Sequence, residues 1–211
     1  MIEPMAASDA VAMLHHVCAV MIAATDVLTD ADLHIGDGDH GIGMRRGFEG
    51  TLAAFEATPP GSIEAAFQAM GGAFLSKTGG AAGAIFGTLF RNGGKALAGR
   101  TVFTGSEVAD FLEAGLAAVQ KRGGATEGQK TVIDALAPAA RAARAAVGGS
   151  VAMVLTATAE AAAGGVEATK AMVATTGKAR SLGERSIGFP DPGALSLSLI
   201  LKAMQRFSAR A

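Results

Sequence analysis

Tryptophan and tyrosine are absent from this sequence of 211 residues, and Cys18 is its single cysteine. One cysteine excludes an internal disulfide and is typical of a reducing compartment. Because Cys18 lies in an apolar stretch, we expect it to be a small buried hydrophobic residue. An excess of one charge is also missing, since 18 Lys and Arg against 19 Asp and Glu leave a net charge of −1. The composition therefore offers no electrostatic reason to bind nucleic acid.

Long hydrophobic runs are missing as well, although half of the residues are hydrophobic. A membrane-spanning helix needs about 18 or more consecutive apolar residues, and Glu160, Glu167 and Lys170 interrupt the longest candidate. Glu3 and Asp9 stand where a signal peptide would carry its basic residues. The sequence thus predicts a soluble cytoplasmic protein that does not contact membranes.

The hydrophobic residues that are present are mostly small, and their spacing predicts helices. Apolar residues recur at helical intervals, and alanine and glycine suit helices that pack closely. A capping box of Thr104 and Glu107 opens one helix, and Asp191 followed by Pro192 opens the last. We expect one all-α domain over residues 1–211, a barrel or bundle of about eight antiparallel amphipathic helices. The helices are expected at 8–28, 43–57, 62–77, around 85–90, 104–121, from 130, at 150–175 and from 191.

Two of these helices have a clearly predicted inward face. It consists of Ile63, Phe67, Met70 and Phe74 on the third helix, and of Leu195, Leu199, Met204 and Phe207 on the last.

The most informative stretch is residues 32–41, between the first two predicted helices. Asp32, Asp37 and Asp39 lie there with two histidines, interleaved with glycines. Carboxylates this dense repel one another unless a cation neutralises them, and hard oxygen ligands favour Mg²⁺ or Ca²⁺. The glycines leave the backbone free to turn tightly around such an ion.

A simple turn with a helix cap, or an EF-hand, would account for parts of this stretch. Asp-Gly pairs are common in turns, and Asp is a common helix N-cap, but neither explains three carboxylates beside His40. An EF-hand fails on register, because counting Asp37 as position 1 places Ile42 at the turn glycine and Phe48 at the bidentate glutamate. We therefore predict a Mg²⁺ site. Because Mg²⁺ held by few side chains usually also binds phosphates, we predict a polyphosphate ligand.

Four connections are informative, and they should lie at the same end of the bundle. The acidic stretch precedes the second predicted helix, a glycine turn (79–84) the fourth, and basic glycine-rich loops (123–129 and 176–190) the sixth and eighth. Alternate connections of an up-and-down bundle share an end, so all four should meet at one rim. A glycine turn that enters a helix presents free N–H groups to an anion. Close helix packing explains the small residues at 79–84 equally well.

Three motifs together resemble the signatures of the dihydroxyacetone kinase L family, in the family's order and over almost the whole chain. They are Gly36-Asp-Gly-Asp-His-Gly41, Gly79-Gly-Ala-Ala-Gly83 with Phe86-Gly-Thr88, and Gly183-Glu-Arg-Ser-Ile-Gly188 with Asp191-Pro-Gly193. The resemblance implies a barrel of eight antiparallel helices with ADP or ATP at one end. It also implies two Mg²⁺ ions held by Asp32, Asp37 and Asp39, which with His40 are the candidate catalytic residues.

The same resemblance implies which residues contact the nucleotide. Residues 40–43 and the glycine turn would contact the phosphates, the next group would lie near the adenine or ribose, and the last group would close the site. In that order they are His40, Gly41, Ile42, Gly43, Gly80, Ala81, Ala82 and Thr88; Gly123 and Val132; and Lys178, Arg185, Asp191, Pro192 and Gly193.

The resemblance also implies an incomplete enzyme. In this family a separate K subunit or domain binds a short-chain ketose through a histidine, and the L part passes the phosphoryl group to it. We therefore expect a K-type partner, with ATP or a phosphotransferase-system protein as the phosphoryl donor, and a homodimer is compatible with the sequence. The alternative is a regulatory protein of the same family that binds Mg-nucleotide without turnover.

Four positions depart from the family pattern. Gly43, Ala82, Lys178 and Phe189 stand where Asn, Ser, Arg and His are usual. Lysine lacks the bidentate fork that arginine offers to phosphate. These departures bear on nucleotide affinity, on the phosphoryl donor and on the substrate, and they leave the three carboxylates unchanged.

Overall fold

The computed structural model describes residues 4–209, and over this range the chain forms nine α-helices, one 3-10 helix and one pair of short strands. The helices are α1 (Ala7–Ala23), α2 (Thr25–Leu33), α3 (His40–Ala57), α4 (Ile63–Lys77), α5 (Gly80–Lys95), α6 (Gly105–Gly123), α7 (Ile133–Ala145), α8 (Val151–Thr169), η1 (Lys178–Ser186) and α9 (Pro192–Ser208), and the strands are β1 (Met5–Ala6) and β2 (Val102–Phe103). The predicted all-α fold is confirmed. The sequence did not predict the strand pair, because strands of two residues show no alternating pattern.

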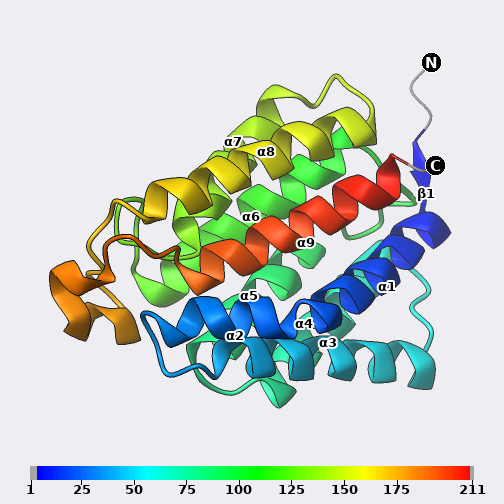
Figure 1. Cartoon of the computed structure of the whole chain (residues 1–211). Coiled ribbons are helices and arrows are strands. Elements are labelled where there is room, and N and C mark those ends of the chain that lie inside the picture. The colour runs from blue at the N-terminus through cyan, green and yellow to red at the C-terminus, as the bar shows by residue number, and fades with distance from the viewer. Residues whose placement is uncertain (1–3, 210–211) are drawn as a thin grey trace.

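The helices close into a barrel (Figure 1). From α2 to α9 each α-helix packs against the next α-helix in the chain, and α9 packs against α1. Helices α1 and α2 form one side of the barrel, bent by 52° at the break between them. The prediction of one continuous helix over 8–28 is wrong here. The Thr25 hydroxyl donates to the Ile22 carbonyl at 2.6 Å, and such a bond back along the chain bends helices.

The barrel interior is filled by phenylalanine, methionine and aliphatic side chains. The face predicted for α4 is confirmed, because Ile63, Phe67, Met70 and Phe74 are all buried. The face predicted for α9 is only partly right, since Leu195, Leu199 and Phe207 are half-buried. The fully packed residues of that helix include Leu197, Ile200, Leu201 and Met204.

Cys18 is buried, as predicted. Burial raises the pKa of its thiol to about 12. The thiolate is therefore scarce at pH 7, which makes the residue unreactive.

Helix α8 runs unbroken through Gly164 and Gly165 and ends at Thr169. The predicted extension of this helix to residue 175 is therefore wrong. Gly165 faces α7 so closely that a Cβ there would lie 2.2 Å from the Asp134 carbonyl oxygen. Its glycine permits close packing of two helices rather than flexibility.

Helix α8 is also long and apolar enough to cross a membrane by length and composition, as is the bent pair of α1 and α2 taken together. Helix α8 packs against both α7 and α9. Its place in the wall of the barrel accounts for its apolar composition.

One end of the barrel carries the connections that the sequence singled out. There α2, α4, α6 and α8 end and α3, α5, α7 and α9 begin. The connections at this end, residues 34–39, 78–79, 124–132 and 170–191, are called the rim. Figure 1 shows the rim with η1 projecting beyond it, and β1 at the opposite end. The four connections lie at one end, as predicted, but residues 80–84 of the predicted glycine turn already belong to α5, and residues 178–186 of the last predicted loop form η1.

Candidate functional site

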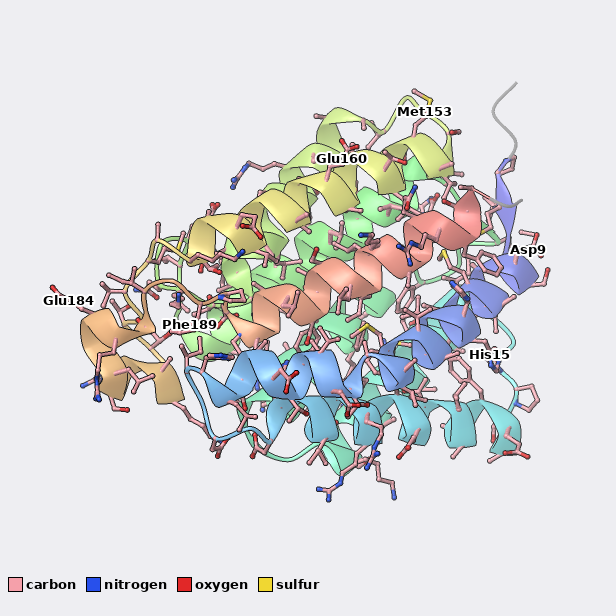
Figure 2. All side chains as sticks on the ribbon, viewed as in Figure 1. Asp9, His15, Met153, Glu160, Glu184 and Phe189 are labelled. Carbon is pink, nitrogen blue, oxygen red and sulfur yellow. The ribbon has the colours of Figure 1, made fainter. Side chains whose placement is uncertain are left out.

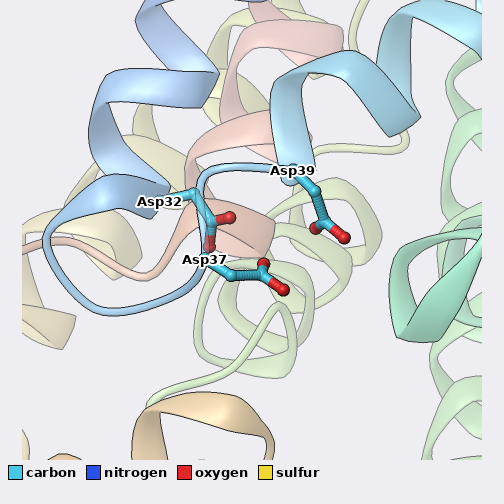
Figure 3. Close-up of side chains that lie close together, drawn as sticks. All are labelled: Asp32, Asp37 and Asp39. Atoms are coloured by element: carbon cyan, nitrogen blue, oxygen red, sulfur yellow. The ribbon is translucent and has the colours of Figure 1, made fainter.

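The carboxylates of Asp32, Asp37 and Asp39 converge at the rim (Figure 3). One oxygen of each lies within 4.8 Å of the others. Asp32, in the last turn of α2, is only 8% exposed, whereas the other two are exposed. A tight turn brings the chain back, because the backbone N–H groups of Ile35 and Gly36 both donate to the Asp32 carbonyl, at 3.1 and 2.6 Å.

Glycines make this turn possible. A Cβ at Gly36 would lie 2.0 Å from Asp32 Oδ1, so any larger residue would displace that carboxylate. Gly38 adopts a φ of +77°, which is the left-handed region that favours glycine. The acidic cluster therefore depends on the glycines between its aspartates.

Lys178 of η1 brings a positive charge to two of the three carboxylates. Its Nζ donates to Asp37 and lies 3.3 Å from Asp39 Oδ2. The hydrogen bond from Lys178 lowers the pKa of Asp37, and the same bond raises the pKa of Lys178. One ammonium group leaves the cluster with uncompensated negative charge.

His40 begins α3 and joins it to α9. Its Nε2 lies 2.7 Å from the Ser196 hydroxyl, and its backbone N–H donates to Asp32 Oδ2 at 3.2 Å. Burial lowers the pKa of His40, opposed by the negative charges of Asp32 and Asp39. The imidazole is therefore neutral at pH 7 and is held in place by α9.

The donor set suits a hard divalent cation. Nε2 of His40 contacts Ser196 and does not join the cluster. The converging groups are the carboxylate oxygens of the three aspartates, the ligands that Mg²⁺ and Ca²⁺ prefer. The absence of a side chain at Gly36 leaves the Asp32 carboxylate its place beside the turn. Asp32, Asp37 and Asp39 thus fit a magnesium site.

Two helix N-termini lie at the rim beside the acidic cluster. Helix α3 begins at His40 and α5 at Gly80, and neither helix is capped by the side chain of its N-cap residue, Asp39 or Gly79. The Thr78 hydroxyl donates to the Gly43 carbonyl at 2.9 Å, which fixes the start of α5 against α3. Unpaired N–H groups at a helix start bind anions, assisted by the helix dipole.

The remaining predicted residues of α3 and α5 differ in depth. Gly41 is buried, and a Cβ there would lie 2.3 Å from the Thr25 carbonyl oxygen of α2. Ile42 and Ala81 are exposed, and Ala82 is half-buried. Thr88 lies two turns into α5 and is only 7% exposed, away from the open rim.

The rim also holds the residues predicted to lie near the nucleoside or to close the site. Val132 and Gly193 face each other, and a Cβ at Gly193 would lie 3.4 Å from Val132 Cβ. Gly123 ends α6 beside Ile85 of α5, and Arg185 is exposed on η1.

Asp191 and Pro192 begin α9, as predicted. The Asp191 carboxylate accepts a hydrogen bond from the Ala194 N–H at 2.7 Å, and Pro192 is buried at the first helical position. Burial raises the pKa of Asp191 to about 7.

Sequence reasoning missed several residues that hold these parts together. Ser196, Thr78 and the buried Lys130 each bond across the rim, but an isolated Ser, Thr or Lys gives no local signal. Phe189 stands out in the sequence only as a departure from the family pattern, yet its ring stacks on His34 with centroids 4.6 Å apart. Figure 2 shows Phe189 against the barrel and Glu184 at the outer tip of η1.

Comparisons with known proteins show similarity in sequence over most of the chain. The family model described as the DAK2 domain matches residues 34–206. The chain is 38% identical over 178 residues to the ADP-binding subunit DhaL of PEP-dependent dihydroxyacetone kinase 1 from Listeria innocua, covering 84% of this chain and 85% of that protein. It is 35% identical over 182 residues to the corresponding DhaL subunit from Escherichia coli, covering 85% of this chain and 87% of that protein.

A solved structure is similar over nearly the whole chain. It is the dihydroxyacetone kinase from C. freundii in complex with AMP-PNP and Mg²⁺, with a TM-score of 0.75 and 26% sequence identity. The match covers 98% of this chain and 35% of that chain.

Proposed function

This chain belongs to the DAK2-domain family, and from that membership and the geometry of the rim we propose that it is the nucleotide-binding phosphoryl-transfer subunit of a dihydroxyacetone kinase-type enzyme. It would bind ADP or ATP and pass a phosphoryl group to a small ketose, dihydroxyacetone or a similar one, on a separate K-type subunit. The observation that carries the proposal is the convergence of Asp32, Asp37 and Asp39 beside the uncapped starts of α3 and α5.

Asp32, Asp37 and Asp39 would hold Mg²⁺, and we propose two ions. When bound, Mg²⁺ neutralises charge on the β- and γ-phosphate oxygens during transfer to an incoming hydroxyl. The three carboxylates are negatively charged, and Lys178 brings one positive charge, to Asp37 and Asp39. The negative charge that remains suits more than one cation.

The chain's own residues would bind and orient the rest of the nucleotide. Backbone N–H groups at residues 40–43 and 80–82 would hold phosphate oxygens, and Lys178 and Arg185 would add positive charge over them. His40, which is neutral and held by Ser196, would contact a phosphate without adding charge. Gly123 and Val132 would lie near the nucleoside, and Asp191, Pro192 and Gly193 would close the site.

The partners follow from the same proposal. A K-type subunit would supply the ketose, and either ATP or a phosphotransferase-system protein would supply the phosphoryl group. We further propose a cytoplasmic location and allow for a homodimer, which light scattering of the purified chain would reveal.

The first experiment identifies the bound nucleotide. The chain has no Trp and no Tyr, so its own ultraviolet absorbance hardly masks that of a nucleotide released on denaturation. ADP that survives dialysis in near-equal amount with the protein would indicate a permanently held nucleotide and a phosphotransferase-system donor. Reversible binding of added Mg-ATP would indicate direct use of ATP. Binding of neither would overturn the proposal.

A matched pair of variants tests the acidic cluster. Asp37→Asn should abolish Mg-ADP binding and leave helix content unchanged, because Asp37 is an exposed ligand rather than a core residue. Asp9→Asn makes the same chemical change at the opposite end of the barrel (Figure 2) and should bind as the wild type does. Normal Mg-ADP binding by Asp37→Asn would refute the metal assignment.

Reconstitution separates an enzyme from a regulator. Mixed with a K-type partner, Mg²⁺, a phosphoryl donor and dihydroxyacetone, the chain should produce phosphorylated ketose. Nucleotide binding together with a proven partner complex, but without product, would instead support the regulatory alternative.

A further inference from the structure

Lys130 lies on the rim yet is almost completely buried, with 2% of its surface exposed. It belongs to the 124–132 connection, between α6 and α7. Its φ is +60°, and among residues 4–209 it is the one residue other than glycine with positive φ. A lysine in this conformation costs free energy that a glycine would avoid, so other contacts must hold it there.

The contacts are made by the ammonium group. Nζ donates to the carbonyl oxygens of Thr169 at 2.5 Å and Phe189 at 2.6 Å. Thr169 is the last residue of α8, where the helix dipole favours a positive charge. Lys130 therefore connects three segments: its own loop, the end of α8 and the segment that leads into α9.

Hydrogen bonds continue from these carbonyls to the start of α9. The Thr169 hydroxyl accepts the Asp191 N–H at 3.0 Å, and the Asp191 carboxylate accepts the Ala194 N–H at 2.7 Å. Within the loop, Asp134 accepts the N–H groups of Gly128 at 2.5 Å and Thr131 at 2.7 Å. Hydrogen bonds to backbone N–H groups thus fix both the loop that carries Lys130 and the segment that its ammonium group contacts.

The consequence is a defined separation between Val132 and Gly193. Val132 follows Lys130 by two residues, and Gly193 follows Asp191 by two. These residues face each other at the rim, where Val132 is proposed to lie near the nucleoside and Gly193 to close the site. The carboxylates that would hold Mg²⁺ come from the acidic loop instead and share no hydrogen bond with Lys130 among those described for residues 4–209.

We propose that Lys130 is a positioning residue that sets the nucleoside end of the site, by joining the 124–132 loop to the end of α8 and the start of α9. It determines how tightly the base and ribose are held and leaves the metal and phosphate end to the acidic loop. This inference rests on the proposed nucleotide-binding function.

A pair of ligands tests the proposal, because one of them has no nucleoside. Mg-ADP engages both ends of the site, whereas Mg-tripolyphosphate offers phosphates alone. Titration calorimetry would measure both affinities for the wild type, Lys130→Gly, Lys130→Gln and the control Lys202→Met, an exposed change on α9. Lys130→Gly removes the ammonium and the unfavourable φ together, while Lys130→Gln keeps the φ and a neutral donor.

The readout is the ratio of the two affinities. Both Lys130 variants should lose about tenfold or more in Mg-ADP affinity, with Mg-tripolyphosphate affinity unchanged. Partial unfolding lowers both affinities by the same factor, so the ratio is unaffected by a purely structural loss. An unchanged ratio would overturn the role of Lys130. A wild type that binds neither ligand would overturn the proposed function itself.

Discussion

The ammonium group of Lys178 contacts the carboxylates of both Asp37 and Asp39, which precede it by 141 and 139 residues. The same two carboxylates would hold Mg²⁺. The ammonium group and the metal therefore compete for the same oxygens. While Lys178 occupies these oxygens, it also connects η1 to the acidic cluster.

Removal of this ammonium should strengthen metal binding. We expect Lys178→Met to raise the affinity for Mn²⁺, a paramagnetic substitute for Mg²⁺, by about two- to fivefold without nucleotide, because an exposed ion pair contributes little free energy. Electron paramagnetic resonance of free Mn²⁺ measures the affinity, and Lys202→Met serves as the control. Unchanged or weaker Mn²⁺ binding by Lys178→Met would contradict the competition.

Gly36 should be as necessary for metal binding as the aspartates. A Cβ at this position would lie 2.0 Å from Asp32 Oδ1, so Gly36→Ala must displace the buried carboxylate. We expect Mn²⁺ affinity to fall by about tenfold or more. Gly72→Ala, where a Cβ meets nothing within 4 Å, should leave it unchanged. Equal affinities of the two variants would show that Asp32 is not a ligand.

Adjacent glycines in α8 should respond oppositely to the same substitution. Gly165→Ala places a Cβ 2.2 Å from the Asp134 carbonyl oxygen and should destabilise the protein by about 2–3 kcal/mol, because α7 and α8 must move apart. At Gly164 a Cβ meets nothing within 4 Å, so alanine should stabilise by about 0.5–1 kcal/mol. Urea unfolding followed by circular dichroism measures both. A stable Gly165→Ala variant would disprove the close packing.

The pKa of Asp191 predicts a specific dependence of stability on pH. Burial raises this pKa from 3.8 to about 7 in the folded protein, and Lys130 and Asp134 are the charged groups near it. The folded state therefore retains a proton that the unfolded state loses. The stabilisation is complete below about pH 4 and is lost as the pH rises through about 7.

The variant Asp191→Asn provides the comparison, since Asn also caps a helix well. Between about pH 4 and pH 8 the wild type should lose on the order of 2–4 kcal/mol of unfolding free energy relative to the variant. Urea unfolding across this range measures the difference. A difference that grows in the opposite direction would mean that Asp191 is charged in the folded protein at low pH.

Local sequence determined the helices and the acidic cluster. Apolar periodicity predicted α4 with its buried face, and the capping box of Thr104 and Glu107 predicted the start of α6. Asp32 lies in the last turn of α2, and Asp37 and Asp39 lie in the connection that follows it, so their convergence follows from a tight glycine turn and needs little of the remaining fold. The placement of all four connections at one rim followed from counting antiparallel helices.

Only the tertiary structure decided which distant residues meet at the rim. The contacts of Lys178 with Asp37, of His40 with Ser196 and of Lys130 with Phe189 join segments 59 to 156 residues apart. No local pattern encodes such pairs, because they depend on the angle and register at which the helices pack. The bend between α1 and α2 and the end of α8 at Thr169 likewise result from packing and single hydrogen bonds, which override helix propensity. Residues 32–39 thus determine the metal-binding chemistry of the site, while the closure of the barrel determines its shape.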